Sequence, residues 1–142
     1  MASFGHAPLI LASASPRRRD LLAQIGIVPA RIAPTDIDET RRKDESPRAL
    51  AERLAREKAV ACDADGFVLA ADTVVALGTR NLEKAENAAE AEAFLRLLSG
   101  RSHQCITGIA VKAPDGRLQS RTVLARVRMK RLTDQEIAAY VA

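Results

Sequence analysis

The stretch Leu9-Ile-Leu-Ala-Ser-Ala-Ser-Pro-Arg-Arg-Arg19 carries a short apolar strand directly into a helix. The apolar run over residues 8–12 has the length of one buried strand. Ser15 is placed to cap the helix, and Pro16 fits its first turn, where a missing N–H has no cost. The free N–H groups of a helix start, with arginines beside them, form an anion-binding site. The same pattern is equally typical of a capped surface helix with solvated arginines, and this stretch alone does not separate the two.

The rest of the chain contains further helices and strands. Ser46-Pro47 repeats the cap signature and opens a predicted helix that runs to about residue 62. Residues 67–77 are almost continuously apolar, which predicts a central strand covered on both faces. Shorter patterns predict strands over 27–35, 104–111 and 123–130, and helices over 87–98 and from 133 onward.

Composition narrows the class of protein. The 142 residues are 47% apolar and 28% charged, which is typical of one globular domain. A net charge of +4 permits an acidic partner, but only 3% of the residues are aromatic, which disfavours a protein that stacks single-stranded bases. Cys62 and Cys105 have no neighbours at metal-ligand spacing, and His6 and His103 are solitary. No apolar run is long enough for a membrane span. We therefore expect a cytoplasmic protein with reduced thiols.

Two charged residues stand where the surrounding pattern is apolar. Lys58 lies on the side of its predicted helix that carries Leu54, about 40° away at 100° per residue. A lysine in this position either extends its ammonium group to solvent or meets an anion. Asp72 interrupts the apolar run of residues 67–77, where an ionised and unpaired carboxylate would be costly. Asp72 therefore needs a cation, a metal ion or a place at a cleft, which favours a functional role.

Motifs in a fixed order over nearly the whole chain resemble those of the Maf-like nucleotide pyrophosphatases. They are Leu11-Ala-Ser-Ala-Ser-Pro-Arg-Arg18, Arg53-Leu-Ala-Arg-Glu-Lys-Ala59, Ala71-Asp-Thr-Val-Val75, Leu82-Glu-Lys84, Leu98-Ser-Gly100 and Thr133-Asp-Gln-Glu-Ile137. Each motif alone is weak, whereas the set is specific. The resemblance implies an α/β fold, with a mixed twisted sheet and flanking helices in two lobes around a cleft, related to the inosine triphosphate pyrophosphatases. We expect a single Maf-like domain over residues 1–142.

The resemblance also implies a reaction and a site. Members of the family hydrolyse nucleoside triphosphates to the monophosphate and pyrophosphate with a divalent metal cation, Mg²⁺ or Mn²⁺, and are usually homodimers. Asp72 matches the catalytic acid of the family, which is treated as the proton acceptor. Asp72 and Glu39 match acidic residues near the metal. The residues implied around the triphosphate are Ser13, Arg17, Arg18, Lys58 and Lys84.

Two positions resemble the branch of the family that prefers pyrimidine nucleotides. Arg17 stands where the branch acting on methylated guanosine triphosphate has an aromatic residue, and Thr73 stands where that branch has Gln. The expected substrates are therefore dTTP, UTP and modified pyrimidine nucleotides. Cations must neutralise roughly four negative charges before a triphosphate can be attacked. Asp72 would hold the metal that activates a water molecule, or would accept the proton of that water directly, and the sequence does not separate these roles.

The last motif, Thr133-Asp-Gln-Glu136, is a capping box that opens a helix near the end of the chain. Since sequences of the family continue further, we expect this chain to lack the C-terminal part of the domain, including a third specificity position. The alternative to an active hydrolase is therefore a weakly active or inactive protein that binds nucleotides or nucleic acid. The basic strand over residues 121–131 favours nucleic acid slightly, and the scarcity of aromatic residues opposes it.

Overall fold

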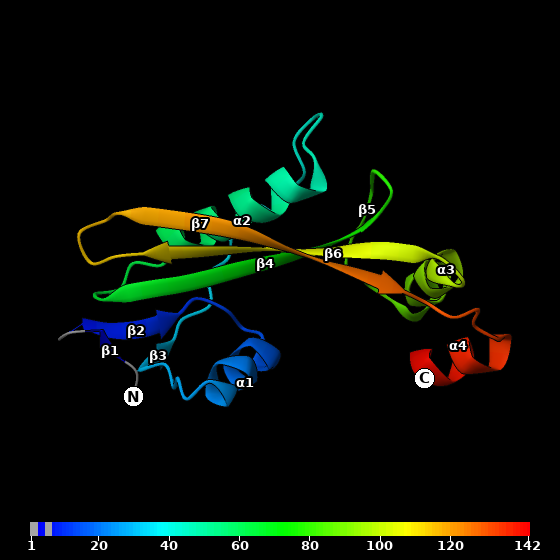
Figure 1. Cartoon of the computed structure of the whole chain (residues 1–142), viewed down its shortest axis with the longest axis horizontal. Helices are drawn as coiled ribbons and strands as arrows, with labels where there is room; N and C mark the ends of the chain where they lie inside the picture. Colours follow the sequence, from blue (N-terminus) through cyan, green and yellow to red (C-terminus); the bar gives the residue numbers. More distant parts are fainter. Residues whose placement is uncertain (1–2, 5–6) are drawn as a thin grey trace.

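Strands of both directions form one mixed sheet in the computed structural model, which describes residues 3–4 and 7–142 (Figure 1). The strands are β1 (Ser3–Phe4), β2 (Ala7–Leu11), β3 (Arg31–Ile32), β4 (Phe67–Leu77), β5 (Arg80–Leu82), β6 (Ser102–Lys112) and β7 (Leu118–Arg128). Their order is β1-β2-β4-β6-β7, with β3 beside β2 and β5 beside β4. β2 runs parallel to β3 and β4, and the other pairs are antiparallel. The predicted mixed sheet is confirmed.

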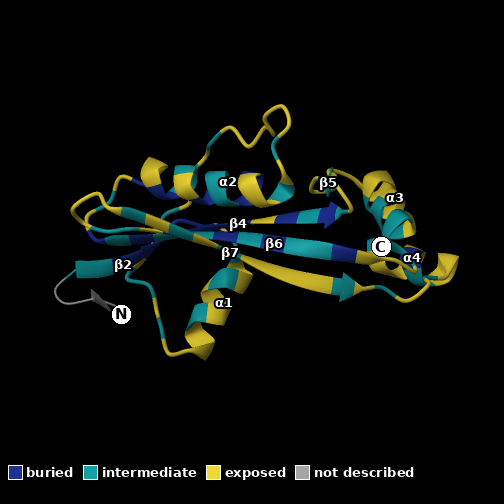
Figure 2. Ribbon diagram, turned by 45° about the horizontal axis from the view of Figure 1, so that its top comes forward, coloured by how far each residue is buried: buried dark blue, intermediate teal, exposed yellow. Residues whose placement is uncertain are grey.

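Helices cover both faces of this sheet. They are α1 (Pro16–Gln24), α2 (Pro47–Ala61), α3 (Ala88–Leu98) and α4 (Asp134–Val141). α2 lies on one face and α1 on the opposite face, while α3 and α4 pack together at one end (Figures 1 and 2). Each helix starts at the cap residue that the sequence predicts, namely Ser15, Ser46, Asn87 and Thr133. No helix within the described ranges combines the length and the apolar character that a membrane span requires.

The hydrophobic core lies between α2 and the long strands β4 and β6 (Figure 2). The apolar stripe of α2 is buried there, as predicted, and consists of Leu50, Ala51, Leu54, Ala55 and Ala59. Successive side chains of a strand point to opposite faces. Val68, Ala70, Val74 and Ala76 of β4 therefore face α2, and all four are buried. Asp72 belongs to the same alternate set, so its carboxylate points toward α2.

Two predicted elements differ from the structure. The expected strand over 27–35 is only the two-residue β3, since prolines at 29 and 34 limit the hydrogen bonds that this segment can donate to a neighbour. The spacing of Leu21, Leu22 and Ile25 predicts an apolar stripe on the first helix, but no residue of α1 is buried, and Leu21 and Ile25 are exposed. His103 lies in β6 and is buried, whereas His6 lies outside the described residues.

Gly108 of β6 allows α2 to approach the sheet closely. It lies opposite Asp72 in the register of β4 and β6. A Cβ atom added at Gly108 would lie only 2.2 Å from the carbonyl oxygen of Ala51 in α2. Because the obstacle is helix backbone, a neighbouring side chain cannot relieve the clash by moving aside. Gly108 thus fixes the distance between α2, which carries Lys58, and β4, which carries Asp72.

We expect Gly108→Ala to lower the free energy of unfolding by about 1–3 kcal/mol, because the extra methyl group overpacks the interface between α2 and the sheet. Thermal melting measures the effect. Gln104→Ala, in the same strand, is the control and should change the melting temperature little. An unchanged melting temperature in Gly108→Ala would show that α2 can move away from the sheet without cost.

Candidate active site

One edge of β4 is open over part of its length. β2 pairs with residues 67–69 of β4, and β5 pairs with residues 75–77 on the same side. Among the described strands, none pairs with residues 70–74 on this edge. The chain leaves β2 here and turns through Ser13 into α1. Ligand sites of open α/β sheets lie beyond the carboxyl ends of their parallel strands, and β2 ends beside this opening. The opening therefore exposes Asp72 and Thr73 next to the start of a helix.

Lys58 meets two carboxylates beside this opening. Its Nζ lies 2.9 Å from Asp72 Oδ1 and 2.9 Å from Glu39 Oε1. The side chains of Asp72 and Lys58 are only 10% and 15% exposed, whereas that of Glu39 is 57% exposed. Of the two possibilities for a lysine on an apolar stripe, the structure therefore shows contact with anions. We call these three residues the Lys58 cluster. Two carboxylates and one ammonium group give it a net charge of −1 when all are ionised.

The environment shifts the pKa values of the two partly buried members of the Lys58 cluster. Burial raises the pKa of Asp72, and this outweighs the lowering by the hydrogen bond and charge of Lys58. Burial alone would lower the pKa of Lys58, but its contacts with Glu39 and Asp72 prevail and raise this pKa above its usual value. Lys58 stays protonated because it forms ion pairs with two carboxylates. Asp72 holds its proton more tightly than an exposed aspartate, as expected of a group that accepts a proton during a reaction.

On the opposite face of β4, Arg18 ties the first turn of α1 to the sheet. Its Nη1 donates a hydrogen bond of 3.1 Å to Ser13 Oγ, and its Nη2 donates one of 3.4 Å to Thr73 Oγ1. Thr73 Oγ1 in turn lies 3.1 Å from Thr107 Oγ1 of β6. Ser13 Oγ also accepts a hydrogen bond from the backbone N–H of Ser15. These contacts aim one guanidinium group at the opening, beside the N-terminus of α1.

Two cavities flank the open edge. One, of about 550 Å³, is lined by Glu39 and Asp72 on the α2 side. The other, of about 920 Å³, is lined by Arg17 and Arg18 on the α1 side. Lys84, in the loop after β5, lines both cavities, so they meet at the opening. The structure thus brings every site residue predicted from the sequence to one region, with carboxylates on one side and arginines on the other.

The carboxylates offer a partial set of metal ligands. Within the described ranges, no three His, Cys, Asp or Glu residues are grouped closely enough to hold a metal ion by themselves. Asp72 Oδ2 makes no hydrogen bond with any described residue, and Glu39 is exposed. Mg²⁺ is commonly held by one or two carboxylates together with substrate phosphates and water. The chemistry and net charge of the Lys58 cluster fit that mode of binding.

Comparison with known proteins identifies the family of the chain. The family model described as "Maf-like protein" matches residues 8–142. The chain belongs to the Maf-like family. It is 79% identical over 139 residues to a protein of Hyphomonas neptunium named dTTP/UTP pyrophosphatase, and the match covers 97% of this chain and 73% of that relative. It is 59% identical over 137 residues to a protein of the same name from Caulobacter vibrioides, covering 94% and 71%.

The fold of this Maf-like chain is similar to that of Ham1 proteins. The HAM1 protein of Coxiella burnetii matches with a TM-score of 0.57 and 17% identity, covering 87% of this chain and 73% of that one. The Ham1 protein of Staphylococcus aureus matches with a TM-score of 0.53 and 16% identity, covering 84% and 70%. At this identity the likeness concerns the fold alone, and it agrees with the architecture expected from the sequence.

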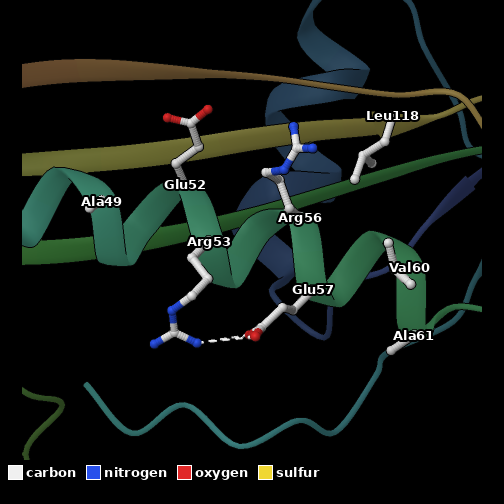
Figure 3. A pocket seen from close by; sticks show the side chains of 8 residues that line it. All are labelled: Ala49, Glu52, Arg53, Arg56, Glu57, Val60, Ala61 and Leu118. Atoms are coloured by element: carbon white, nitrogen blue, oxygen red, sulfur yellow. Dashed lines mark hydrogen bonds and ion pairs between the residues drawn. The ribbon is translucent and has the colours of Figure 1, made fainter. Parts of the chain in front are cut away.

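Two features of the Maf-like site were not predicted from the sequence. Thr107 joins the site because β6 pairs with β4 in a register that sets it opposite Thr73. Arg53 lies on the outer side of α2, where it borders an open hollow and contacts Glu57 (Figure 3). The motif that contains Arg53 indicated the family, but it did not indicate a role for Arg53. The hollow itself is lined by Ala49, Glu52, Arg53, Arg56, Glu57, Val60, Ala61 and Leu118, none of which was predicted as a site residue.

Proposed function

We propose that this protein hydrolyses nucleoside triphosphates to the monophosphate and pyrophosphate, with dTTP and UTP as preferred substrates. The observation that carries the proposal is the Lys58 cluster at the open edge of β4, facing Arg18 across the opening. Relatives that are 79% and 59% identical bear the name dTTP/UTP pyrophosphatase, which supports both the reaction and the pyrimidine preference. The cavities at the opening offer space for a nucleotide.

The cationic residues would bind the triphosphate. Arg17 and Arg18 can grip phosphate oxygens in bidentate fashion, while Lys84 acts as a point charge from the other side of the opening. Ser13 Oγ already accepts hydrogen bonds from Arg18 and from the N–H of Ser15. Its hydroxyl hydrogen is therefore free to be donated to a phosphate. Lys58 would neutralise negative charge of the triphosphate next to Asp72.

Asp72 and Glu39 would hold the divalent cation, Mg²⁺ or Mn²⁺, together with the substrate phosphates. When bound, the cation neutralises phosphate charge and makes a water molecule more acidic. Asp72 Oδ2, which accepts no hydrogen bond from Lys58, would accept the proton of the attacking water. The raised pKa of Asp72 suits this role, because a base that holds a proton more tightly takes it more readily once ionised.

A panel of nucleoside triphosphates tests the proposal. With Mg²⁺, UTP and dTTP should be turned over faster than GTP and ATP, and chelation of the metal with EDTA should stop the reaction until Mg²⁺ is restored. Binding to duplex DNA, measured at several salt concentrations, tests the alternative that the protein binds nucleic acid instead of hydrolysing triphosphates. Salt-sensitive DNA binding without turnover of any triphosphate would overturn the proposed function.

Thr73 is proposed to contribute to the choice of base. Its hydroxyl links Arg18 to Thr107, so a longer side chain would break this link and fill part of the cavity on the α1 side. We expect Thr73→Gln to lower kcat/KM for UTP by about 10–200-fold, the range of a poor pocket fit. Thr73→Ser keeps the hydroxyl and should retain most of the activity. Equal kcat/KM in Thr73→Gln and the parent protein would remove Thr73 from substrate selection.

A further inference from the structure

Arg53 makes an unusually complete set of polar contacts for a surface helix. Its Nε and Nη2 donate to the two carboxylate oxygens of Glu45 at 2.6 and 2.9 Å, a bidentate pair. Its Nη1 lies 2.8 Å from Glu57 Oε2, the pair joined in Figure 3, and its Nη2 also donates to the backbone oxygen of Thr40 at 3.0 Å. The side chains of Arg53 and Glu45 are only 15% and 9% exposed. The burial and the bidentate geometry distinguish this pair from ordinary exposed ion pairs, which contribute little to the stability of the fold.

Glu45 in turn closes the segment that precedes α2. Its carboxylate accepts the backbone N–H of Arg42 at 3.1 Å, and its own N–H donates to the Arg42 carbonyl oxygen at 3.2 Å. Its carbonyl oxygen accepts a hydrogen bond of 2.6 Å from Arg41 Nε. Asp44 has a φ of 60°, a left-handed conformation that aspartate adopts more readily than most residues other than glycine. The contacts of Glu45 with Arg53 and Arg42 therefore stabilise a turn whose conformation the local sequence permits.

This segment carries Glu39 into the Lys58 cluster. Thr40, whose carbonyl oxygen is held by Arg53, is the next residue in the chain. Glu39 itself is more than half exposed, and its carboxylate forms an ion pair with Lys58. Ile37 packs against the core near Leu50 and anchors the segment on the other side of Glu39. Arg53 and Ile37 thus hold the backbone on both sides of Glu39.

We infer that Arg53 and Glu45 form a clamp that positions Glu39 for metal and triphosphate binding. The inference rests on the proposed function, because it assigns Arg53 and Glu45 as positioning residues of that same site. Neither residue touches the Lys58 cluster, so they act through the backbone at Thr40. Ordering a residue costs conformational entropy, and because the clamp already orders the backbone at Thr40, less of this cost remains when the ligand binds. Loss of residues that orient metal ligands typically weakens metal affinity or activity by about 10–100-fold.

The test combines Glu45→Gln and Glu39→Gln in a double-mutant cycle, with the Mg²⁺ dependence of UTP turnover as the measured quantity. Glu45→Gln alone should raise the Mg²⁺ concentration needed for half-maximal activity by about 10–100-fold. In the Glu39→Gln background, the same change should have no further effect, since the clamp acts through Glu39. Additive effects would overturn the inference, because they would mean that Glu45 acts independently of Glu39.

A second measurement uses the metal-free protein. Amide hydrogen exchange over residues 39–45 should be faster in Glu45→Gln and in Arg53→Met/Glu45→Met, which removes both charges of the clamp together. Arg53→Lys should keep part of the protection that the parent protein shows. Arg56→Ala, on the same helix, should leave the protection unchanged. Unchanged exchange in an active enzyme would disprove the clamp alone. Absence of any triphosphate turnover in the parent protein would instead disprove the proposed function and, with it, the assigned role of the clamp.

The clamp also predicts a pH dependence of stability. The hydrogen bond from Arg53 lowers the pKa of Glu45 to about 2, with smaller contributions from the backbone N–H and the charge of Arg42. Because this pKa is lower in the folded state, the ionised clamp stabilises the fold fully above the usual pKa of about 4.5. This contribution is lost as the pH falls toward 2. The difference in unfolding free energy between the parent protein and Glu45→Gln should therefore shrink over that interval, as urea titrations at several pH values would show.

Discussion

Replacing Asp72 by asparagine is expected to lower turnover of UTP and dTTP by at least about 10²-fold. The amide keeps the shape of the side chain but cannot accept the proton of the attacking water or provide a charged metal ligand. The fold should be preserved. Burial raises the pKa of Asp72, so its ionised form destabilises the folded state at neutral pH, and the neutral amide removes this cost. We therefore expect a melting temperature equal to or above that of the parent protein.

Asp63→Asn provides the matched control, because Asp63 is an exposed carboxylate just before β4. It should leave both turnover and melting temperature unchanged. Steady-state kinetics at saturating Mg²⁺, together with thermal melting, measure both expectations. Turnover by Asp72→Asn at the rate of the parent protein would remove Asp72 from the mechanism, and the candidate site would have to lie elsewhere.

Replacing Lys58 by methionine should affect both activity and stability. It leaves Asp72 and Glu39 near each other without the cation that separates them, and it removes one positive charge near the triphosphate. We expect turnover to fall by about 10²-fold. Breaking a fully buried ion pair costs about 3–5 kcal/mol, but Glu39 is 57% exposed and water can screen its charge. The loss in unfolding free energy should therefore be smaller than this range.

Comparison with Lys84→Met separates the effect of Lys58 on nucleotide binding from its effect on stability. Lys84 lines both cavities but makes no ion pair with any described residue. Its loss should weaken nucleotide binding without lowering the melting temperature, whereas Lys58→Met should change both. Isothermal titration with a non-hydrolysable UTP analogue measures the affinity. Unchanged affinity in both variants would show that the nucleotide does not bind at this opening.

Local sequence patterns predicted much of this molecule because they depend on near neighbours. Cap residues such as Ser15 and Ser46 start helices through hydrogen bonds to backbone N–H groups only a few residues ahead. Lys58 and Asp72 could be singled out because each breaks a regular apolar period. Their pairing with each other could not be derived from periodicity alone, since it depends on how α2 lies across β4.

The features that escaped prediction depend on distant parts of the chain. The open edge of β4 exists because β2 ends and β5 begins at particular residues of that strand, and the sequence pattern does not specify this register. Thr107 enters the site for the same reason. The clamp of Arg53 and Glu45 involves an irregular segment, which has no period from which contacts could be predicted. In the sequence, residues 40–45 are mostly charged, a pattern that most simply predicts a solvated connection.

The identity of the products is the most direct test of the proposed hydrolysis. UTP is incubated with the protein and Mg²⁺, and phosphorus-31 NMR follows the reaction. We expect equal amounts of UMP and pyrophosphate, formed by the parent protein and not by Asp72→Asn. Formation of UDP and orthophosphate, or equal product from Asp72→Asn, would contradict the proposed hydrolysis at the open edge of β4.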